Sequence, residues 1–591
     1  MGAAFGFWGP PDRGLLAAMA ANLRHRGRGT PVFVERPWAS IGYDPAPDDV
    51  PRLGALAGHW RDGDVDVVLA GDPSSVDGVQ YGAEGEPGVA VAGRRALVEA
   101  WRARGITGLA SLSPPWIAAI LEPGRLTLAR DHVGMRQLAW GRFGDRVLFA
   151  SEPKGLWRLP GFPRRLHLPA LAQYLACSFV FPPHTMLADV FALGCGHALV
   201  LDDAGVHERG FFDFESIPED PAVDEPTWSS RTAGALAQAC RERLPGRGDV
   251  GLYLSGGLDS SIVGVELARA APGRVHSFSI HFGAKLPNEL GYARAVASHL
   301  GLEHHEVALR PRDFLPRFRE VAWHLDDPIG DPITVPNFEL SRRVAATTKL
   351  VFNGEGGDPV FGGPKNLPMM LSHWYGGVDH GPGSRERAYL TSFRRAYDEL
   401  DRLLSPEARA QIDPDRDLVA PLTARLHADR PPTLLGKLQA ANIRLKGAHL
   451  ILPKVERMTA AAHVAIQSPL FDPRLVALSF AMPGAMKLRA GVEKWVLKRA
   501  YADALPAEVI ARPKSGMRVP VHDWFLGDMR GHARALLSRR RVEQHGLWSY
   551  LRVAQILAYD REQPGGRYGL KLWMLVAFET WRALVLDGEA P

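Results

Sequence analysis

The stretch Gly251–Leu267, GLYLSGGLDSSIVGVEL, decides the fold of the second half of the chain. An apolar run meets the loop Ser255–Ser261, SGGLDSS, and apolar residues then recur with helical spacing, which predicts a strand, a tight loop and a helix. Gly256 and Gly257 allow backbone N–H groups to approach an anion, so the loop is typical of a phosphate site. The Gly-Lys-Ser/Thr ending of a Walker A loop is absent, and we therefore expect Asp259 to act with Mg²⁺. The alternative is a tight turn in which Asp259 only caps the helix.

The composition is that of an ordinary soluble protein with two or more domains. The chain has 591 residues, 46% of them hydrophobic and 23% charged. A net charge of +5, spread over this length, does not indicate nucleic-acid binding. Cys177, Cys195 and Cys240 show no CxxC spacing and are expected to be reduced. No signal peptide or membrane-spanning stretch is recognisable, so the expected location is the cytoplasm, with no membrane partner.

The predicted secondary structure changes along the chain. Residues 1–213 are β-rich, with hairpins expected to turn at Pro123-Gly124 and at Gly144-Asp145. This predicts an antiparallel, layered domain. Residues 214–227 are acidic and proline-rich, which is typical of a linker. In residues 228–591 strands first alternate with helices, which predicts a parallel sheet, and the remainder is expected to be mostly helical.

The loop SGGLDSS resembles the pyrophosphate loop of the asparagine synthetase family, whose members cleave ATP between the α- and β-phosphates. The resemblance implies an α/β protein: an N-terminal antiparallel layered domain of the Ntn-glutaminase type, then a parallel-sheet ATP-pyrophosphatase (PP-loop) synthetase domain. Other stretches similar to the family are LRHRG (23–27), LARDHVGMRQLAW (128–140), LFASEPKGL (148–156), LDDPIGDP (325–332), NGEGGDPVFGG (353–363), VERMTAAAHVAIQSPLFDPRLV (455–476) and VIARPKSGMRVPV (509–521).

The same resemblance implies roles for individual residues. Asp259 and Asp358 match the carboxylates that hold Mg²⁺ and the pyrophosphate. Lys514 and Glu355 match catalytic positions: the lysine stabilises charge on the α-phosphate and the acyl intermediate, and the glutamate is a tyrosine in β-lactam synthetases. Taken without the family, Lys514 is equally well interpreted as a solvated loop lysine. The residues expected to bind ATP are Leu254, Ser255, Gly257, Asp259, Ser260, Ile280, Asn353 and Gly354.

The N-terminal half lacks the features that the family uses to hydrolyse glutamine. Those enzymes carry a cysteine nucleophile directly after the initiator methionine, whereas this chain has Gly2 and no cysteine before Cys177. Glycine offers no nucleophile. The segments LAGDPSS (69–75) and AGRRAL (92–97) also replace the family's glutamine-holding segments. We therefore expect a domain that is retained as a fold and inactive as a glutaminase.

Without ammonia from glutamine, the simplest acceptor is an amine on the substrate itself, as in β-lactam synthetases and lasso-peptide cyclases. Glu355 disfavours the first, and Ala465 and Gln467, where asparagine synthetases carry Glu and Arg, disfavour aspartate as substrate. The expected activity is therefore that of a lasso-peptide macrolactam synthetase. It would adenylate a side-chain carboxylate of a precursor peptide, and the peptide's N-terminal amine would close the ring. The expected partners are this core peptide, a leader peptidase and a leader-recognition protein.

Several alternatives stay open. The chain could be a β-lactam-type or other amide ligase, or an asparagine synthetase that uses free ammonia. A non-catalytic scaffold is disfavoured because the phosphate loop is intact. The segment LPMMLSHWYGG (367–377) could line a peptide cavity or be ordinary helical core. His304 and His305 suggest a metal, but a similar pair occurs in strands of the family, so the structural interpretation is preferred.

Overall fold

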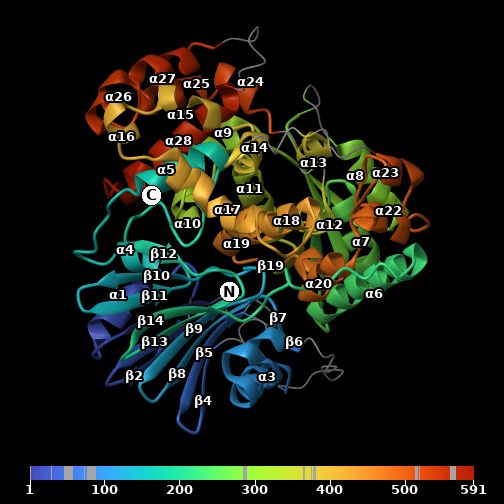
Figure 1. Cartoon of the computed structure of the whole chain (residues 1–591), viewed down its shortest axis with the longest axis horizontal. Coiled ribbons are helices and arrows are strands. Elements are labelled where there is room, and N and C mark those ends of the chain that lie inside the picture. Colours follow the sequence, from blue (N-terminus) through green and yellow to red (C-terminus); the bar gives the residue numbers. More distant parts are fainter. Residues whose placement is uncertain are drawn as a thin grey trace.

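The chain forms two antiparallel sheets followed by a parallel sheet enclosed in helices (Figure 1). The computed structural model describes residues 2–27, 29–45, 58–71, 74–75, 88–283, 286, 289–363, 367–374, 376, 381–512, 517, 519–559 and 568–591. For residues 74–75, 88–95 and 367 only the backbone is described.

The first part of the chain holds two six-stranded antiparallel sheets. One has the order β12-β10-β11-β1-β3-β2, with strands Val190–Ala192, Ala139–Phe143, Arg146–Ala150, Ala3–Trp8, Ala39–Asp44 and Val32–Arg36. The other has the order β14-β13-β9-β8-β5-β4, with strands Gly205–Gly210, His197–Asp202, Arg125–Arg130, Trp116–Glu122, Val65–Gly71 and Gly58–Asp62. A small ribbon pairs β6 (Ser74–Ser75) with β7 (Leu112–Ser113). Both predicted hairpins, β8–β9 and β10–β11, are confirmed.

The two sheets pack face to face and carry helices on their outer faces. Ile41 of the first sheet and Val68 of the second belong to one buried cluster between them. Helices α1 (Arg13–Asn22) and α5 (Leu168–Cys177) share a core with the first sheet, and α3 (Gly88–Arg104) shares one with the second. This helix–sheet–sheet–helix arrangement confirms the predicted antiparallel layered domain.

The second part is built on a five-stranded sheet with every pair parallel, in the order β17-β16-β15-β18-β19. The strands are Glu303–Ala308, Val275–His281, Val250–Tyr253, Leu350–Phe352 and Ala465–Gln467. Helices α6 (Glu225–Arg243), α7 (Leu258–Ala270) and α8 (Leu290–His299) cover one face, while α11 (Thr334–Val344) and α19 (Leu452–Ala461) cover the other. The predicted parallel sheet is confirmed, and β19 is an additional strand that the sequence did not reveal.

Most of the remaining helices belong to the second part of the chain, and many of them lie in the upper half of Figure 1. Helix α6 begins at Glu225, so the last residues of the predicted linker 214–227 form its first turn. The other helical segments are α4 (Lys154–Trp157), η1 (Gly105–Ser111), α9 (Pro311–Phe314), η2 (Leu315–Arg317), α10 (Phe318–Leu325), α12 (Gly357–Phe361), α13 (Leu367–Trp374), α14 (Ser384–Ser392), η3 (Tyr397–Glu399), α15 (Leu400–Leu403), α16 (Pro406–Arg409), η4 (Asp415–Val419), α17 (Ala420–Leu426), α18 (Leu434–Ala441), η5 (Asn442–Ile451), η6 (Pro469–Phe471), α20 (Pro473–Ala481), α21 (Gly484–Lys487), α22 (Trp495–Ala500), α23 (Ala507–Ala511), α24 (Val521–Leu526), α25 (Arg530–Leu536), α26 (Arg539–His545), α27 (Tyr550–Leu557) and α28 (Tyr568–Val585), with a ribbon of β20 (Leu488–Arg489) and β21 (Val492–Glu493).

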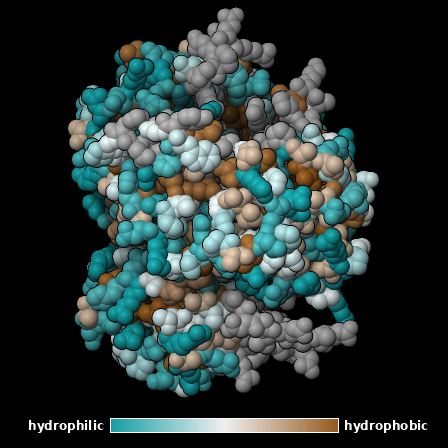
Figure 2. Space-filling view, turned by 45° about the vertical axis from the view of Figure 1, so that its right-hand side comes forward, coloured by the Kyte–Doolittle hydropathy of each residue, from teal (hydrophilic) through white to brown (hydrophobic). Residues whose placement is uncertain are grey.

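The C-terminal helix is a core element. Helix α28 buries Leu572, Trp573, Val576 and Phe578. Among the described residues, no helix combines the length and the apolar character needed to cross a membrane. The face drawn in Figure 2 accordingly mixes hydrophilic side chains with small apolar patches.

Buried charged groups join the two parts of the chain. Arg26 donates through Nη1 and Nη2 to the two carboxylate oxygens of Glu456, at 2.7 Å each, and Arg136 Nη1 donates to Glu456 Oε1 at 3.0 Å. Burial alone would raise the pKa of Glu456, but Arg26 and Arg136 outweigh it and lower the pKa to about 2. Lys154 Nζ donates to Asp326 Oδ2 at 2.8 Å. Several of the stretches that resemble the asparagine synthetase family therefore form the contact between the domains.

Candidate active site

The quoted loop connects β15 to α7 as predicted. Gly256 has a φ of +71°, and a Cβ there would lie 2.4 Å from the backbone nitrogen of Ala293, so the site requires glycine. Ser255 Oγ lies 3.1 Å from Ser260 Oγ and accepts a hydrogen bond from Gly257 N at 3.3 Å. Hydroxyls and backbone N–H groups thus gather at the N-terminus of a 13-residue helix, which is a favourable place for an anion.

Two further glycines bring a second segment against this loop. A Cβ at Gly354 would lie 2.4 Å from the backbone nitrogen of Ser260, and a Cβ at Gly357 would lie 2.3 Å from Cγ of Asp259. The segment after β18 therefore packs directly on the first turn of α7. This places Asp358, in the first turn of α12, beside Asp259.

The two carboxylates share one buried ammonium group. Lys494 Nζ lies 2.6 Å from Asp259 Oδ2 and 2.5 Å from Asp358 Oδ1, and the lysine is 2% exposed. Lys494 precedes α22 and adopts a left-handed backbone conformation, with a φ of +55°. The prediction that Asp259 lacks a lysine within its loop is correct, but a lysine from a distant segment pairs with it. No spacing in the sequence marks Lys494.

The two carboxylates line one cavity with a volume of about 200 Å³. Of the residues assigned to the site from the sequence, Leu254, Ser255, Gly257, Asp259, Ser260, Ile280, Asn353, Gly354, Glu355 and Asp358 all line it. The sequence did not single out the other lining residues, which are Tyr253, Phe278, Ser279, Glu289, Ile333, Asn337, Leu340, Gly356, Pro359, Ile451, Val455 and Met517. The cavity therefore has a polar floor around the loop and a largely apolar wall, which suits a nucleotide with its phosphates at the loop. The individual roles stay predictions.

Lys514 lies outside the described residues, whereas residues on both sides of it are described. Arg512 Nη1 donates to Gly256 O at 3.4 Å, and its guanidinium lies 4.0 Å from the ring centre of Tyr292. Met517, on the other side, lines the cavity. Both flanks of this segment are thus at the candidate site.

A buried lysine interacts with the carboxylate of Glu355. Lys454 Nζ donates to Asp331 Oδ2 at 2.9 Å. Burial lowers the pKa of Lys454, but Asp331 and Glu355 outweigh this and hold the pKa above its usual value. For Asp331, burial acts to raise the pKa, while Lys454 and Arg395 lower it to about 2. Glu355 therefore interacts with a buried pair of opposite charges that does not itself line the cavity.

The carboxylates of the acidic segment 325–332 lie in two different environments. Asp331 pairs with Lys454, as above, whereas Asp326 and Asp327 line a second cavity between the domains, together with His449 and Arg457. Arg457 Nη1 lies 3.1 Å from Asp326 Oδ2. Asp326 and Asp327 thus belong to the domain contact and not to the nucleotide cavity.

Ala465, Gln467 and the described residues of α13 do not line the cavity. Ala465 and Gln467 are buried in β19, and the carbonyl oxygen of Gln467 accepts a hydrogen bond from Asn353 N at 3.1 Å. In α13, Met369 and Met370 are buried in the main core, whereas Leu371 and Trp374 are exposed. None of the described residues of α13 lines the nucleotide cavity.

The position of the missing nucleophile is filled by a neighbour. A Cβ at Gly2 would lie 2.3 Å from Oη of Tyr43 and 2.6 Å from the carbonyl oxygen of Asp44. Both neighbours are buried, and burial raises the pKa of Asp44 to about 6. All three cysteines of the chain, Cys177, Cys195 and Cys240, are buried as well. The segments that replace the family's glutamine-holding segments are described only in part. Residues 72–73 and the side chains of 92–95 lie outside the described residues.

Comparison with known proteins agrees with this division of the chain. Residues 231–583 match the family model "Asparagine synthase", and residues 95–212 match "Glutamine amidotransferase domain". The chain is 24% identical over 486 residues to asparagine synthetase [glutamine-hydrolyzing] 1 of Bacillus subtilis, covering 78% of this chain and 75% of that protein. It is 28% identical over 498 residues to a putative asparagine synthetase [glutamine-hydrolyzing] of Mycobacterium bovis, with the same coverage.

A solved structure with similar elements is the glutamine PRPP amidotransferase of B. subtilis, with 13% identity, 61% of this chain and 83% of that chain covered, and a TM-score of 0.25. That superposition is too loose to carry an argument. The fold and site, with the family matches, define an ATP-dependent, amide-forming ligase. The family model matches more than half of the chain, and the chain belongs to the asparagine synthase family.

Proposed function

We propose that this ligase is a lasso-peptide macrolactam synthetase, which closes an isopeptide ring within a precursor peptide at the cost of ATP. A side-chain carboxylate oxygen of the peptide attacks the α-phosphorus, and the bond from that phosphorus to the bridging oxygen breaks, so that pyrophosphate leaves. The peptide's N-terminal amine then attacks the acyl carbon of the adenylate, AMP leaves and the amine loses a proton. The sum of the two steps is ring closure with loss of one water from the peptide.

The residues of the cavity divide this work. Ser255, Ser260 and the N-terminus of α7 hold the phosphates that leave. Asp259 and Asp358 both offer hard carboxylate oxygens and already share one cation, the ammonium of Lys494. This donor set fits Mg²⁺, which would neutralise the pyrophosphate when bound. Lys514 stabilises charge at the α-phosphate, as the family resemblance implies. We assign to Glu355, which lines the cavity, the role of accepting the proton that the amine loses.

The observation that carries this proposal is a contrast: the phosphate loop is intact, whereas the position where the family has its cysteine nucleophile is a glycine packed against Tyr43. Gly2 has no room for a side chain beside Tyr43, and the three cysteines are buried, so no cysteine is placed to release ammonia from glutamine. A ligase without its own ammonia source needs an amine from elsewhere. An amine on the activated substrate is held close to the acyl carbon, which favours ring closure. The core peptide, a leader peptidase and a leader-recognition protein are the partners proposed with it.

The test is to incubate the purified chain with ATP, Mg²⁺ and a leader-free precursor peptide. The expected products are AMP, pyrophosphate and a peptide lighter by one water, which tandem mass spectrometry would show to be a ring. A peptide whose N-terminal amine is acetylated is the matched control and should not cyclise. ADP as the product would exclude the adenylate mechanism.

A second candidate is asparagine formation from aspartate and free ammonia, because the relatives reported above are named asparagine synthetases. It predicts that AMP release depends on aspartate and ammonium and needs no peptide. The same AMP assay, run with aspartate and ammonium in place of the peptide, distinguishes the two. A small free amino acid that supports AMP release without ammonium would instead indicate a β-lactam-type ligase.

A further inference from the structure

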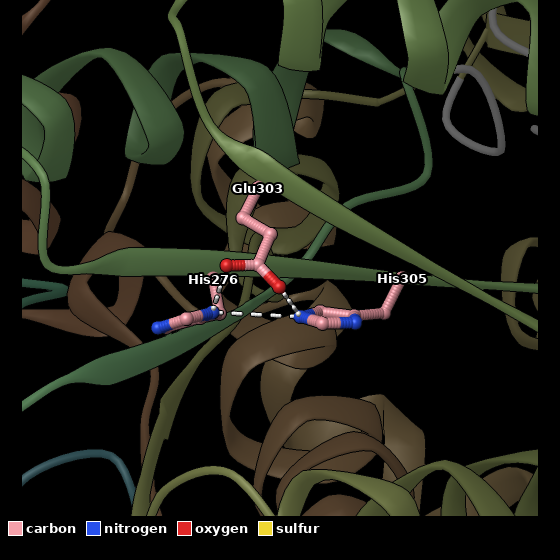
Figure 3. Close-up of side chains that lie close together, drawn as sticks. All are labelled: His276, Glu303 and His305. Atoms are coloured by element: carbon pink, nitrogen blue, oxygen red, sulfur yellow. Dashed lines mark hydrogen bonds and ion pairs between the residues drawn. The ribbon is translucent and has the colours of Figure 1, made fainter.

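Three side chains with metal-binding atoms meet at the edge of the parallel sheet, away from the phosphate loop. In the part of the chain that the structure describes, His276, Glu303 and His305 form the one group of three such residues whose donor atoms all lie within 4.8 Å of one another. Figure 3 shows the two imidazole rings edge to edge, with the carboxylate of Glu303 above the gap between them. The sequence drew attention to His304 and His305 as a pair, but His304 is not part of this group.

The register of the two strands produces the cluster. His276 of β16 lies opposite Glu303 of β17, and Phe278 lies opposite His305. Side chains two residues apart point to the same face of a sheet, so His276, Glu303 and His305 share a face while His304 points away. His304 instead lies with Nδ1 2.8 Å from Ser277 Oγ.

The donor atoms have the spacing expected of ligands around one metal ion. His276 Nδ1 and His305 Nε2 are 3.4 Å apart, Glu303 Oε2 lies 3.4 Å from His276 Nδ1, and Glu303 Oε1 lies 3.3 Å from His305 Nε2. Two nitrogens bound to Zn²⁺ at about 2.1 Å in a tetrahedron are themselves about 3.4 Å apart. The two ring nitrogens thus have the spacing of neighbouring zinc ligands, and the carboxylate of Glu303 presents one oxygen to each of them.

A fourth residue supports the arrangement from behind. Asp249 Oδ2 lies 3.4 Å from Nε2 of His276, the ring nitrogen on the side away from the cluster. Histidines that bind zinc commonly direct their second ring nitrogen to a carboxylate, which fixes the ring and makes the other nitrogen a better ligand. The ring of His305 is held as well, because it stacks on Phe278 with ring centres 4.7 Å apart.

We propose that His276, Glu303 and His305 bind a first-row divalent cation of the zinc type, separately from any ion at the phosphate loop. Imidazole nitrogen with one carboxylate suits Zn²⁺, whereas the all-carboxylate pair Asp259 and Asp358 suits Mg²⁺. The ion would tie the edge strand β17 to β16. That strand is mostly exposed or half-buried, so a bond of this kind would add to its few apolar contacts.

The test is equilibrium dialysis of the tag-free full chain against Zn²⁺ in excess Mg²⁺, with bound zinc counted by mass spectrometry. The wild type should hold about one Zn²⁺ per chain. His276→Ala and His305→Ala should lose it, and Asp249→Asn should weaken it by about 10-fold or more. His197→Ala, which removes the histidine of a surface histidine–carboxylate pair, is the matched control and should bind like the wild type.

Two measurements keep the outcome clear. Asp259→Asn should retain the zinc, because the proposed site does not use the phosphate loop; loss of zinc in this variant would assign the ion to the loop and overturn the proposal. Zn²⁺ should raise the thermal unfolding midpoint of the wild type but not that of His276→Ala, and circular dichroism would confirm that the variant is folded. Equal zinc binding by the wild type and a folded His276→Ala, His305→Ala double variant would also overturn it.

Discussion

Gly256 in the phosphate loop and Gly2 beside the first strand are both glycines whose missing Cβ leaves no free space, but different atoms occupy that space. At Gly256 it is the backbone of α8, 2.4 Å away at the nitrogen of Ala293. At Gly2 it is the side chain of Tyr43, 2.3 Å away. A close backbone contact of this kind is part of the geometry of the loop itself. A bulky side chain, in contrast, occupies volume that another side chain could otherwise fill. The first glycine shapes the phosphate loop, and at the second the neighbouring atoms leave no room for a side chain.

The charges in the two regions differ in the same way. At the loop, Asp259 and Asp358 share the ammonium of Lys494 and face an open cavity. Beside Gly2, the carboxylate of Asp44 is fully buried and its partner Arg24, at 3.6 Å, is largely exposed. The first arrangement can exchange partners with a nucleotide and a cation. The second carries a fully buried carboxylate whose pKa is raised by burial.

The largest effect should come from the carboxylates of the loop. Asp259→Asn and Asp358→Asn should each reduce ATP-dependent pyrophosphate release by at least about 100-fold, because each removes a charged oxygen that the proposed Mg²⁺ site needs. Pyrophosphate release under saturating ATP measures this. Asp203→Asn, in the exposed turn after β13, is the control and should not change the rate. Near-normal release by either loop variant would show that its carboxylate does not bind the metal.

Lys494 should matter for both stability and turnover. Lys494→Met leaves two neighbouring carboxylates without their shared cation, which should lower the free energy of unfolding by about 3 kcal/mol in the absence of Mg²⁺. Added Mg²⁺ should recover part of this loss, because the cation takes the place of the ammonium. Denaturant unfolding with and without Mg²⁺ measures the difference.

The control for that experiment is Lys498→Met in the following helix, α22, where the lysine lies 4.0 Å from Glu493. It should show neither the loss nor the recovery. If Mg²⁺ stabilised the wild type and Lys494→Met equally, then the cation would not occupy the position of the Lys494 ammonium group.

The phosphate loop could be predicted in detail because its chemistry is local. Strand, loop and helix follow one another within Gly251–Leu267, and the periodicity of the apolar residues and the pair of glycines are both visible there. Both N-terminal hairpins were predictable for the same reason, since each turns at a Pro-Gly or Gly-Asp pair.

What the sequence did not reveal depends on contacts between distant segments. Lys494 reaches Asp259 across 235 residues, and β19 is a three-residue strand that takes its place only by pairing with β18. The cluster of His276, Glu303 and His305 depends on the register of two strands. Tyr43 beside Gly2 depends on the pairing of β1 with β3. Long-range contacts of this kind leave no periodic pattern in the sequence.

A side chain at Gly2 should destabilise the fold and restore no activity. Gly2→Ala should lower the free energy of unfolding by about 1–3 kcal/mol, because its Cβ must displace Tyr43 in a close-packed core. Gly2→Cys should release no glutamate from glutamine above background. Gly14→Ala in helix α1, where a Cβ meets only Asp12 Oδ1 at 3.4 Å, is the matched control and should be neutral or stabilising. Glutamate release by Gly2→Cys would show that the pocket for glutamine is still present.

The smallest effect concerns Asp44 and the pH dependence of stability. Burial raises the pKa of Asp44 to about 6, above its usual 3.8, so the folded chain holds this proton more tightly than the unfolded chain does. The contribution of the protonated group to stability is complete below pH 4 and is lost as the pH rises through about 6. Asp44→Asn is neutral throughout, so its free energy of unfolding at pH 7.5 should exceed that of the wild type by about 1–3 kcal/mol. The difference, measured by denaturant unfolding, should shrink toward pH 4. Asp203→Asn should follow the wild type at both pH values. A constant difference between Asp44→Asn and the wild type from pH 4 to 7.5 would mean that the carboxylate is already ionised in the folded chain. The region beside Gly2 would then hold a paired charge, as the phosphate loop does, and the contrast between the two regions would rest on Tyr43 alone.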